Sequence, residues 1–123
     1  MKKKLTTEED YRLRVDRVCM YIREHLDKEI DMRRLAVLSA FSPFHFHRIM
    51  RAYLKEPIGA FIIRTRVETA AKLLRYTDLP VADIAYRVGY DTPSSLTKSF
   101  CKLFGISPKM YRLTKNYQMM TTR

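Results

Sequence analysis

Residues 81–104 read VADIAYRVGYDTPSSLTKSFCKLF, a pattern that predicts two helices joined by a tight turn. Apolar side chains recur at helical intervals until Gly89, a residue type that commonly ends a helix. Thr92 and Pro93 then predict the start of a longer helix, because threonine caps a helix and proline fits its first turn. A short helix, a tight turn and a longer helix form the helix-turn-helix unit. The apolar residues expected to face inward are Val81, Ile84, Ala85, Val88, Leu96, Phe100, Leu103 and Phe104.

The same unit occurs earlier in the chain, so the sequence contains an internal repeat. Ala40 corresponds to Gly89 at an offset of 49 residues. One residue is then inserted, and Arg48 corresponds to Lys98 at an offset of 50. Matching apolar residues alone would mean only similar packing. A basic residue repeated at the same exposed position indicates a shared binding function.

Helical spacing of apolar residues extends through the rest of the chain, which contains only three glycines. We expect an all-α protein of seven helices, with two helix-turn-helix subdomains joined by a long central helix. Thr7 with Asp10 predicts the cap of the first helix, and Asp31 and Ser42 predict the caps of the second and third. The expected organisation is a basic tail at 1–7, a first subdomain at 8–56, a linker helix at 57–77, a second subdomain at 78–116, and a C-terminal tail or start of a linker at 117–123.

The chain is strongly basic, with 24 Lys+Arg against 13 Asp+Glu and a net charge of +11. This excess predicts an anionic partner, most often nucleic acid. Residues 8–31 hold eight of the acids, whereas residues 32–55 and 92–123 hold none. A uniformly solvated surface would mix the two signs, so the acid-free windows predict one anion-facing surface in each repeat. The alternative is a chance scattering of basic residues over solvated helices.

The longer helix of each repeat is expected to present a cationic face to solvent. When the apolar stripe of residues 43–54 is buried, the opposite face consists of Phe44, His47, Arg48, Arg51 and Lys55. The corresponding face of residues 93–104 consists of Ser94, Ser95, Thr97, Lys98 and Lys102. The major groove of B-DNA admits an α-helix and presents acceptors that suit these donors. Phe44 fits two roles equally well, contact with a thymine methyl group or packing against the preceding turn.

Several motifs at fixed spacing resemble the AraC/XylS family of bacterial transcription regulators, including the small regulators of the MarA, SoxS and Rob type. These motifs are Val81-Ala82-Asp83-Ile84-Ala85, Val88-Gly89-Tyr90, Leu96, Phe100, Phe104-Gly105-Ile106-Ser107-Pro108 and Tyr111-Arg112. The similarity extends over residues 11–113, and FSPFHFHR at 41–48 resembles a subgroup in which a GyrI-like effector domain follows. The resemblance implies a monomer that reads two successive major-groove segments of duplex DNA with helices 43–54 and 93–104, and an activator that recruits RNA polymerase.

The resemblance also implies roles for individual residues. The family's base-reading positions fall on Phe44, His47, Arg48, Ser94, Ser95, Thr97 and Lys98. Phosphate contacts, which position a protein on DNA rather than specify a sequence, are expected at Arg51, Lys55, Lys102, Ser107 and Lys109. The sequence departs from the family pattern at Ala40, Cys101 and Ile63. If the backbone at Ala40 is left-handed, alanine costs about 1–2 kcal/mol there relative to the family's frequent glycine.

A metal or cofactor site is not expected. His45 and His47 lie two residues apart, so on a helix their side chains point about 200° apart and cannot bind one ion together. We expect His45 to be buried or at the boundary of the core instead. Cys101 has Lys98 and Lys102 beside it, a setting that suits a redox sensor, but no resolving cysteine accompanies it, so we expect no sensing role.

Other functional classes are less well supported by the sequence. It contains no P-loop, G-x-G-x-x-G or G-x-S-x-G motif, so we expect no enzymatic activity. No apolar run of about 18 residues occurs, which predicts no membrane-spanning helix, and cysteine use without a signal peptide predicts a cytoplasmic location. Two alternatives stay open: a non-specific or RNA-binding basic module, and a helical protein that binds a membrane surface or a partner protein. If the chain is part of a longer regulator, an effector domain is expected after residues 117–123.

Overall fold

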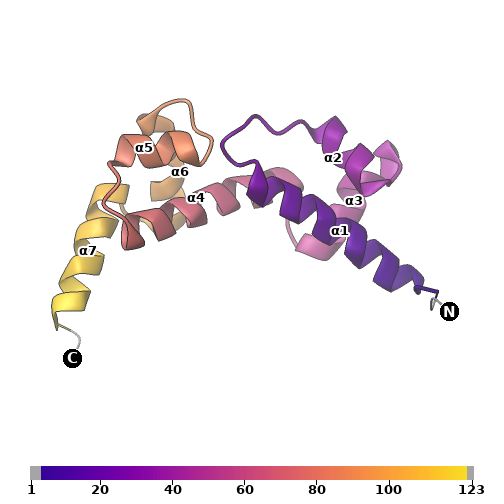
Figure 1. Ribbon diagram of the computed structural model, residues 1–123, viewed down its shortest axis with the longest axis horizontal. Helices are drawn as coiled ribbons and strands as arrows, with labels where there is room; N and C mark the ends of the chain where they lie inside the picture. Colours follow the sequence, from indigo (N-terminus) through magenta and orange to yellow (C-terminus); the bar gives the residue numbers. More distant parts are fainter. Residues whose placement is uncertain (1–3, 122–123) are drawn as a thin grey trace. The chain divides into compact units, whose positions relative to one another are not determined.

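The computed structural model describes residues 4–121, with side chains described as far as Thr114. Within that range the chain forms seven α-helices, which confirms the expected all-α fold. They are α1 (Thr7–Glu24), α2 (Met32–Ser39), α3 (Pro43–Leu54), α4 (Ile58–Tyr76), α5 (Val81–Arg87), α6 (Pro93–Phe104) and α7 (Pro108–Thr121) (Figure 1). The two predicted tails include residues 1–3 and 122–123, which lie outside the described residues.

Contacts divide the chain into two compact units, residues 1–62 and 63–123. In the first unit, α1, α2, α3 and the start of α4 surround an apolar cluster. Its buried members are Val15, Val18, Cys19, Ile22, Leu26, Leu35, Ala36, Phe41, Phe46, Met50, Ile58, Phe61 and Ile62. Phe46 and Met50 are among them, which confirms the apolar stripe expected on α3.

The second unit encloses a separate apolar cluster between the rest of α4 and the helices that follow. Its buried members are Val67, Ala70, Ala71, Leu74, Ile84, Ala85, Val88, Leu96 and Phe100. The expectation that Leu103 and Phe104 face inward is wrong, because they are 47% and 39% exposed. The last turn of α6 runs past the cluster before Gly105 ends the helix in a left-handed conformation, φ 77°. The Phe104 ring stacks on Phe100 with a centroid distance of 4.6 Å, at the edge of the core.

Side-chain caps fix the starts of α1, α2 and α3. The predicted cap of α1 is wrong by one residue: Thr6 Oγ1 accepts the Glu9 N–H at 3.1 Å, and Glu9 Oε1 accepts the Thr6 N–H at 3.0 Å. Only the pair Thr6 and Glu9 supplies both halves of a capping box, and the bonds from Thr6 hold the pKa of Glu9 below its usual value. The predicted caps of α2 and α3 are confirmed, because Asp31 and Ser42 each accept a backbone N–H of their helix, at 2.9 Å and 3.3 Å.

Candidate nucleic-acid interface

The turn between α2 and α3 is held in one conformation by local hydrogen bonds. Ala40 has φ 60° and ψ 19°, so the left-handed backbone considered for it is present. Its N–H donates to the Val37 carbonyl at 3.1 Å. The buried hydroxyl of Ser39 donates to the Ala36 carbonyl at 2.7 Å and accepts the Phe41 N–H at 3.1 Å. These bonds end α2 and set the point from which α3 begins.

The exposed face of α3 carries the residues that the sequence placed on it. The structure places all five in solvent: Phe44, His47, Arg48, Arg51 and Lys55. Phe44 is 93% exposed, so it does not pack against the preceding turn. The Phe44 ring, at the start of a cationic helix, is therefore available for an apolar contact with a ligand.

The exposed face of α6 is hydroxyl-rich and cationic. Thr92 caps the helix as predicted, its Oγ1 accepting the Ser95 N–H at 3.1 Å. The Ser95 hydroxyl lies 3.0 Å from the same Thr92 oxygen and therefore shares a hydrogen bond with the cap. Thr97 is half-buried. The exposed residues of the predicted set on α6 are Ser94, Ser95, Lys98 and Lys102.

The three remaining residues that were predicted to contact phosphates differ in their surroundings. Lys55 follows α3 with φ 65° and lines a surface hollow together with Glu8 and Arg12. Ser107 is half-buried, and its Oγ accepts the Met110 N–H at 3.1 Å, so this hydroxyl begins α7. Lys109 is exposed in the first turn of the same helix.

One basic residue of the acid-free window 92–123 faces inward. Arg112 Nε donates to the Leu74 carbonyl at 3.1 Å, and its Nη2 donates to the Thr77 carbonyl at 3.1 Å. A guanidinium group at the last carbonyls of α4 satisfies acceptors that the helix itself leaves unpaired. The charge of Arg112 therefore supports the fold of the second unit, and Arg112 is not a candidate for the anion-facing surface predicted for this window.

The histidines and cysteines do not gather at one place. His45 is exposed, so the expectation that it lies in or at the boundary of the core is wrong. Cys19 is buried and Cys101 is exposed on α6. Among the side chains that are described, no group of three or more His, Cys, Asp or Glu is placed to hold a metal ion. No helix within residues 4–121 combines the length and apolar content needed to span a membrane.

Comparison with known proteins connects both units to one family. Residues 35–114 match the model of a family described as a helix-turn-helix domain. The chain is 33% identical over 100 residues to the HTH-type transcriptional activator AarP of Providencia stuartii, covering 81% of this chain and 74% of that protein. It is 35% identical over 100 residues to the F1 operon positive regulatory protein of Yersinia pestis, covering 80% of this chain but only 33% of that protein.

A solved structure gives the same relationship in three dimensions. The DNA-binding domain of the global transcriptional factor AdpA, in complex with a target DNA, matches this fold with a TM-score of 0.78 at 28% sequence identity. The match covers 89% of this chain and 96% of that domain. The similarity therefore includes both helix-turn-helix units rather than one of them.

Proposed function

Because this chain belongs to the AraC/XylS family of helix-turn-helix transcription regulators, we propose that it binds duplex DNA sequence-specifically through α3 and α6. The two DNA-binding subdomains are residues 8–56 and 78–116, joined by the helix at 57–77. The observation that carries this proposal is the repeated face: each longer helix exposes hydrogen-bond donors, and neither contains a carboxylate. An α-helix of this kind fits the major groove, whose base edges present matching acceptors.

The proposed roles follow from accessibility. The candidates for base contacts are Phe44, His47, Arg48, Ser94, Ser95, Thr97 and Lys98, of which all but Thr97 are exposed. Arg51, Lys102 and Lys109 are proposed to contact phosphates, since all three are exposed cations. Lys55 and Ser107 are weaker candidates, because the first shares a surface hollow with the acidic residue Glu8 and the hydroxyl of the second caps α7.

The two other classes of partner are less well supported by the exposed faces. Recognition of RNA by stacking favours accessible aromatic rings, and α6 presents none within the proposed set. Binding of a membrane surface by a basic helix requires an apolar face that points outward along the helix. On α6, Leu96 and Phe100 are fully buried in the second cluster, and the exposed leucine and phenylalanine, Leu103 and Phe104, are confined to the last turn.

Selection of bound sequences from random duplex DNA tests the proposal. We expect a single preferred motif with two half-sites about one helical turn apart, 34–36 Å, and footprinting should show both protected. A selection that yields no motif, or protection of only one groove segment, contradicts reading by two helices. RNA and anionic lipid vesicles serve as competitors that identify the two other partner classes.

Broader features of the role are proposed by similarity to the relatives. The activator and positive regulatory protein named above support a positive effect on transcription. We propose in addition that the protein contacts RNA polymerase and binds DNA as a monomer. Such a role places the protein in the cytoplasm. If the chain is part of a longer regulator, a C-terminal effector domain is proposed to control it.

Affinity should depend strongly on salt, and a lysine variant should isolate one part of that dependence. We expect Lys102→Ala to weaken binding to all sequences alike and to reduce the slope of log affinity against log salt by about 0.9, because one counterion fewer is released. Titrations at several salt concentrations, on the preferred site and on a scrambled duplex, measure this. A loss confined to the preferred site would instead assign Lys102 to base contact.

Cys101 provides a natural reporter of the α6 face. N-ethylmaleimide should alkylate Cys101 at least about tenfold faster than Cys19, because Cys19 is 6% exposed and burial raises its thiol pKa. Cys101 follows Lys98 by three residues on the same helix face, so bound DNA should protect it. Mass spectrometry of tryptic peptides gives both rates, and scrambled duplex at high salt is the control. Unchanged alkylation of Cys101 in the specific complex contradicts contact through this face.

A further inference from the structure

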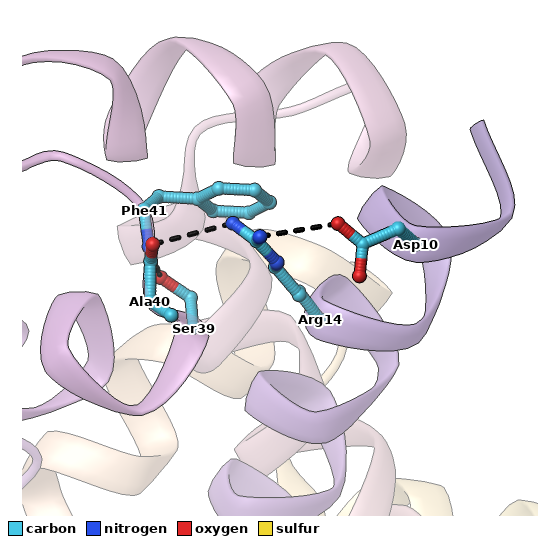
Figure 2. Close-up of polar contacts among 5 residues, drawn as sticks. All are labelled: Asp10, Arg14, Ser39, Ala40 and Phe41. Carbon is cyan, nitrogen blue, oxygen red and sulfur yellow. Dashed lines mark hydrogen bonds and ion pairs between the residues drawn. The ribbon is translucent and has the colours of Figure 1, made fainter. Parts of the chain in front are cut away.

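Arg14 of α1 reaches the turn of the first helix-turn-helix unit, 26 residues further along the chain. Its Nη1 donates to the Ala40 carbonyl at 3.2 Å, and its Nη2 pairs with Asp10 Oδ2 at 3.1 Å. The guanidinium carbon lies 5.0 Å from the centroid of the Phe41 ring and 5.7 Å from that of Tyr11. Figure 2 shows the guanidinium group between the Asp10 carboxylate and the Ala40 carbonyl, with the Phe41 ring beside it.

The contacted residue is the one whose backbone needs support. Ala40 is left-handed with φ 60°, a conformation that a side chain disfavours. The corresponding residue of the second unit is Gly89, with φ 99°, where no side chain is present to oppose it. A charge-assisted hydrogen bond to the Ala40 carbonyl favours the peptide orientation that this conformation requires. Arg14 thus acts on the strained residue of the turn between α2 and α3.

The charge of Arg14 is already partnered within the unit. Its side chain is 29% exposed, and the Asp10 carboxylate that it pairs with is one turn away on α1. Arg12 provides a contrast, because its side chain is 62% exposed and its closest approach to Glu8 is 3.7 Å. Arg14 is therefore placed to hold the turn rather than to meet a phosphate group.

We propose that Arg14 is a positioning residue for α3: with Asp10 and the Phe41 ring, it holds Ala40 in the left-handed conformation and so fixes the direction in which α3 leaves the turn. The turn between α2 and α3 has only three residues, from Ala40 to the cap Ser42, so a change at Ala40 moves the whole helix. The part of this inference that concerns DNA rests on the proposed function. The part that concerns the turn does not.

Hydrogen exchange without DNA tests the turn itself. In Arg14→Ala, we expect the Ala40 and Phe41 amides to exchange about tenfold faster than in the wild type, because the bond to the turn is lost. The Tyr90 amide, which donates to the Ala85 carbonyl in the second unit, should not change. Arg12→Ala is the matched control, since it removes the same charge from the same helix, and it should leave the turn protected. Unchanged exchange at the turn in Arg14→Ala overturns the proposal.

Two further variants separate positioning from general destabilisation. Arg14→Lys keeps the charge but has only one side-chain nitrogen, so it lacks the pair of nitrogens that reach the Ala40 carbonyl and the Asp10 carboxylate. It should therefore not restore the protection of the turn against exchange. Ala40→Gly removes the strain, so Arg14→Ala should accelerate exchange much less in that background than in the wild type. Equal acceleration in both backgrounds, or a loss of protection throughout α1 and α3 that Ala40→Gly does not reverse, overturns the proposal.

DNA affinity gives an independent measurement. Arg14→Ala should weaken specific binding about tenfold while leaving the salt slope unchanged, whereas loss of a phosphate contact would reduce that slope by about 0.9. A reduced slope overturns the positioning role. If the wild-type chain selects no DNA motif, the proposed function fails, and the exchange measurements still decide whether Arg14 holds the turn.

Discussion

Replacing Arg48 with alanine is expected to abolish base preference at roughly one or two base pairs of one half-site while leaving the other half-site unchanged. Arg48 is exposed on α3 one residue after His47, and its counterpart in the second unit is Lys98. A bidentate contact between arginine and guanine contributes about 1–3 kcal/mol of discrimination, which corresponds to about 5- to 150-fold in affinity. Sequence selection repeated with the variant, followed by titration of the selected sites, measures both effects.

Arg17→Ala is the control for this experiment, because Arg17 is an exposed arginine on the acidic helix α1. It removes the same charge and should not change the selected motif. A uniform loss of affinity over all sequences in Arg48→Ala, together with a smaller salt slope, would show that Arg48 contacts phosphate instead of bases.

Two phenylalanines that are two residues apart on α3 should respond in opposite ways to truncation. Phe46 is 1% exposed and Phe44 is 93% exposed. Phe46→Ala should cost about 3–5 kcal/mol of the free energy of unfolding, because it leaves a cavity in the first cluster. Phe44→Ala should change that free energy by less than about 0.5 kcal/mol, since it removes no core contact. Chemical denaturation followed by circular dichroism measures the difference.

For DNA binding we expect the reverse: Phe44→Ala should have a larger direct effect on affinity than Phe46→Ala. Under conditions in which both variants are folded, Phe44→Ala should lose affinity for sites that carry a thymine at the contacted position, whereas folded Phe46→Ala retains the exposed face. Each variant is therefore the control for the other. Equal destabilisation by the two substitutions would contradict the placement of Phe44 in solvent.

Features that depend on neighbouring residues could be predicted from the sequence. Ser42 and Thr92 each precede a proline and cap the helix that follows, because a cap involves only residues within one turn. The repeated apolar spacing correctly predicted the buried residues in the middle of α3 and α6. It failed for Leu103 and Phe104, since periodicity continues to the end of a helix whether or not the core extends that far.

Features that depend on contacts between distant residues could not be predicted in the same way. Arg112 bonds to carbonyls 35 and 38 residues earlier, and Arg14 bonds to one 26 residues later. In the sequence, Arg14 and Arg112 cannot be distinguished from exposed basic residues such as Arg48 or Lys102. The residues next to an arginine do not indicate whether it donates to a distant backbone carbonyl. The four-residue spacing of Asp10 and Arg14 predicts an ion pair on the surface of a helix. It does not predict the hydrogen bond from Arg14 to the turn.

The sharing of α4 between two apolar clusters has a consequence for synthesis on the ribosome. Ile58, Phe61 and Ile62, at the start of α4, are 3–5% exposed within the first cluster. A nascent chain that ends at Glu56 lacks all three, so α1, α2 and α3 can be complete while their common core is still open to water. The first unit can close only after Ile62 has left the exit tunnel, and until then its apolar surface is available to chaperones.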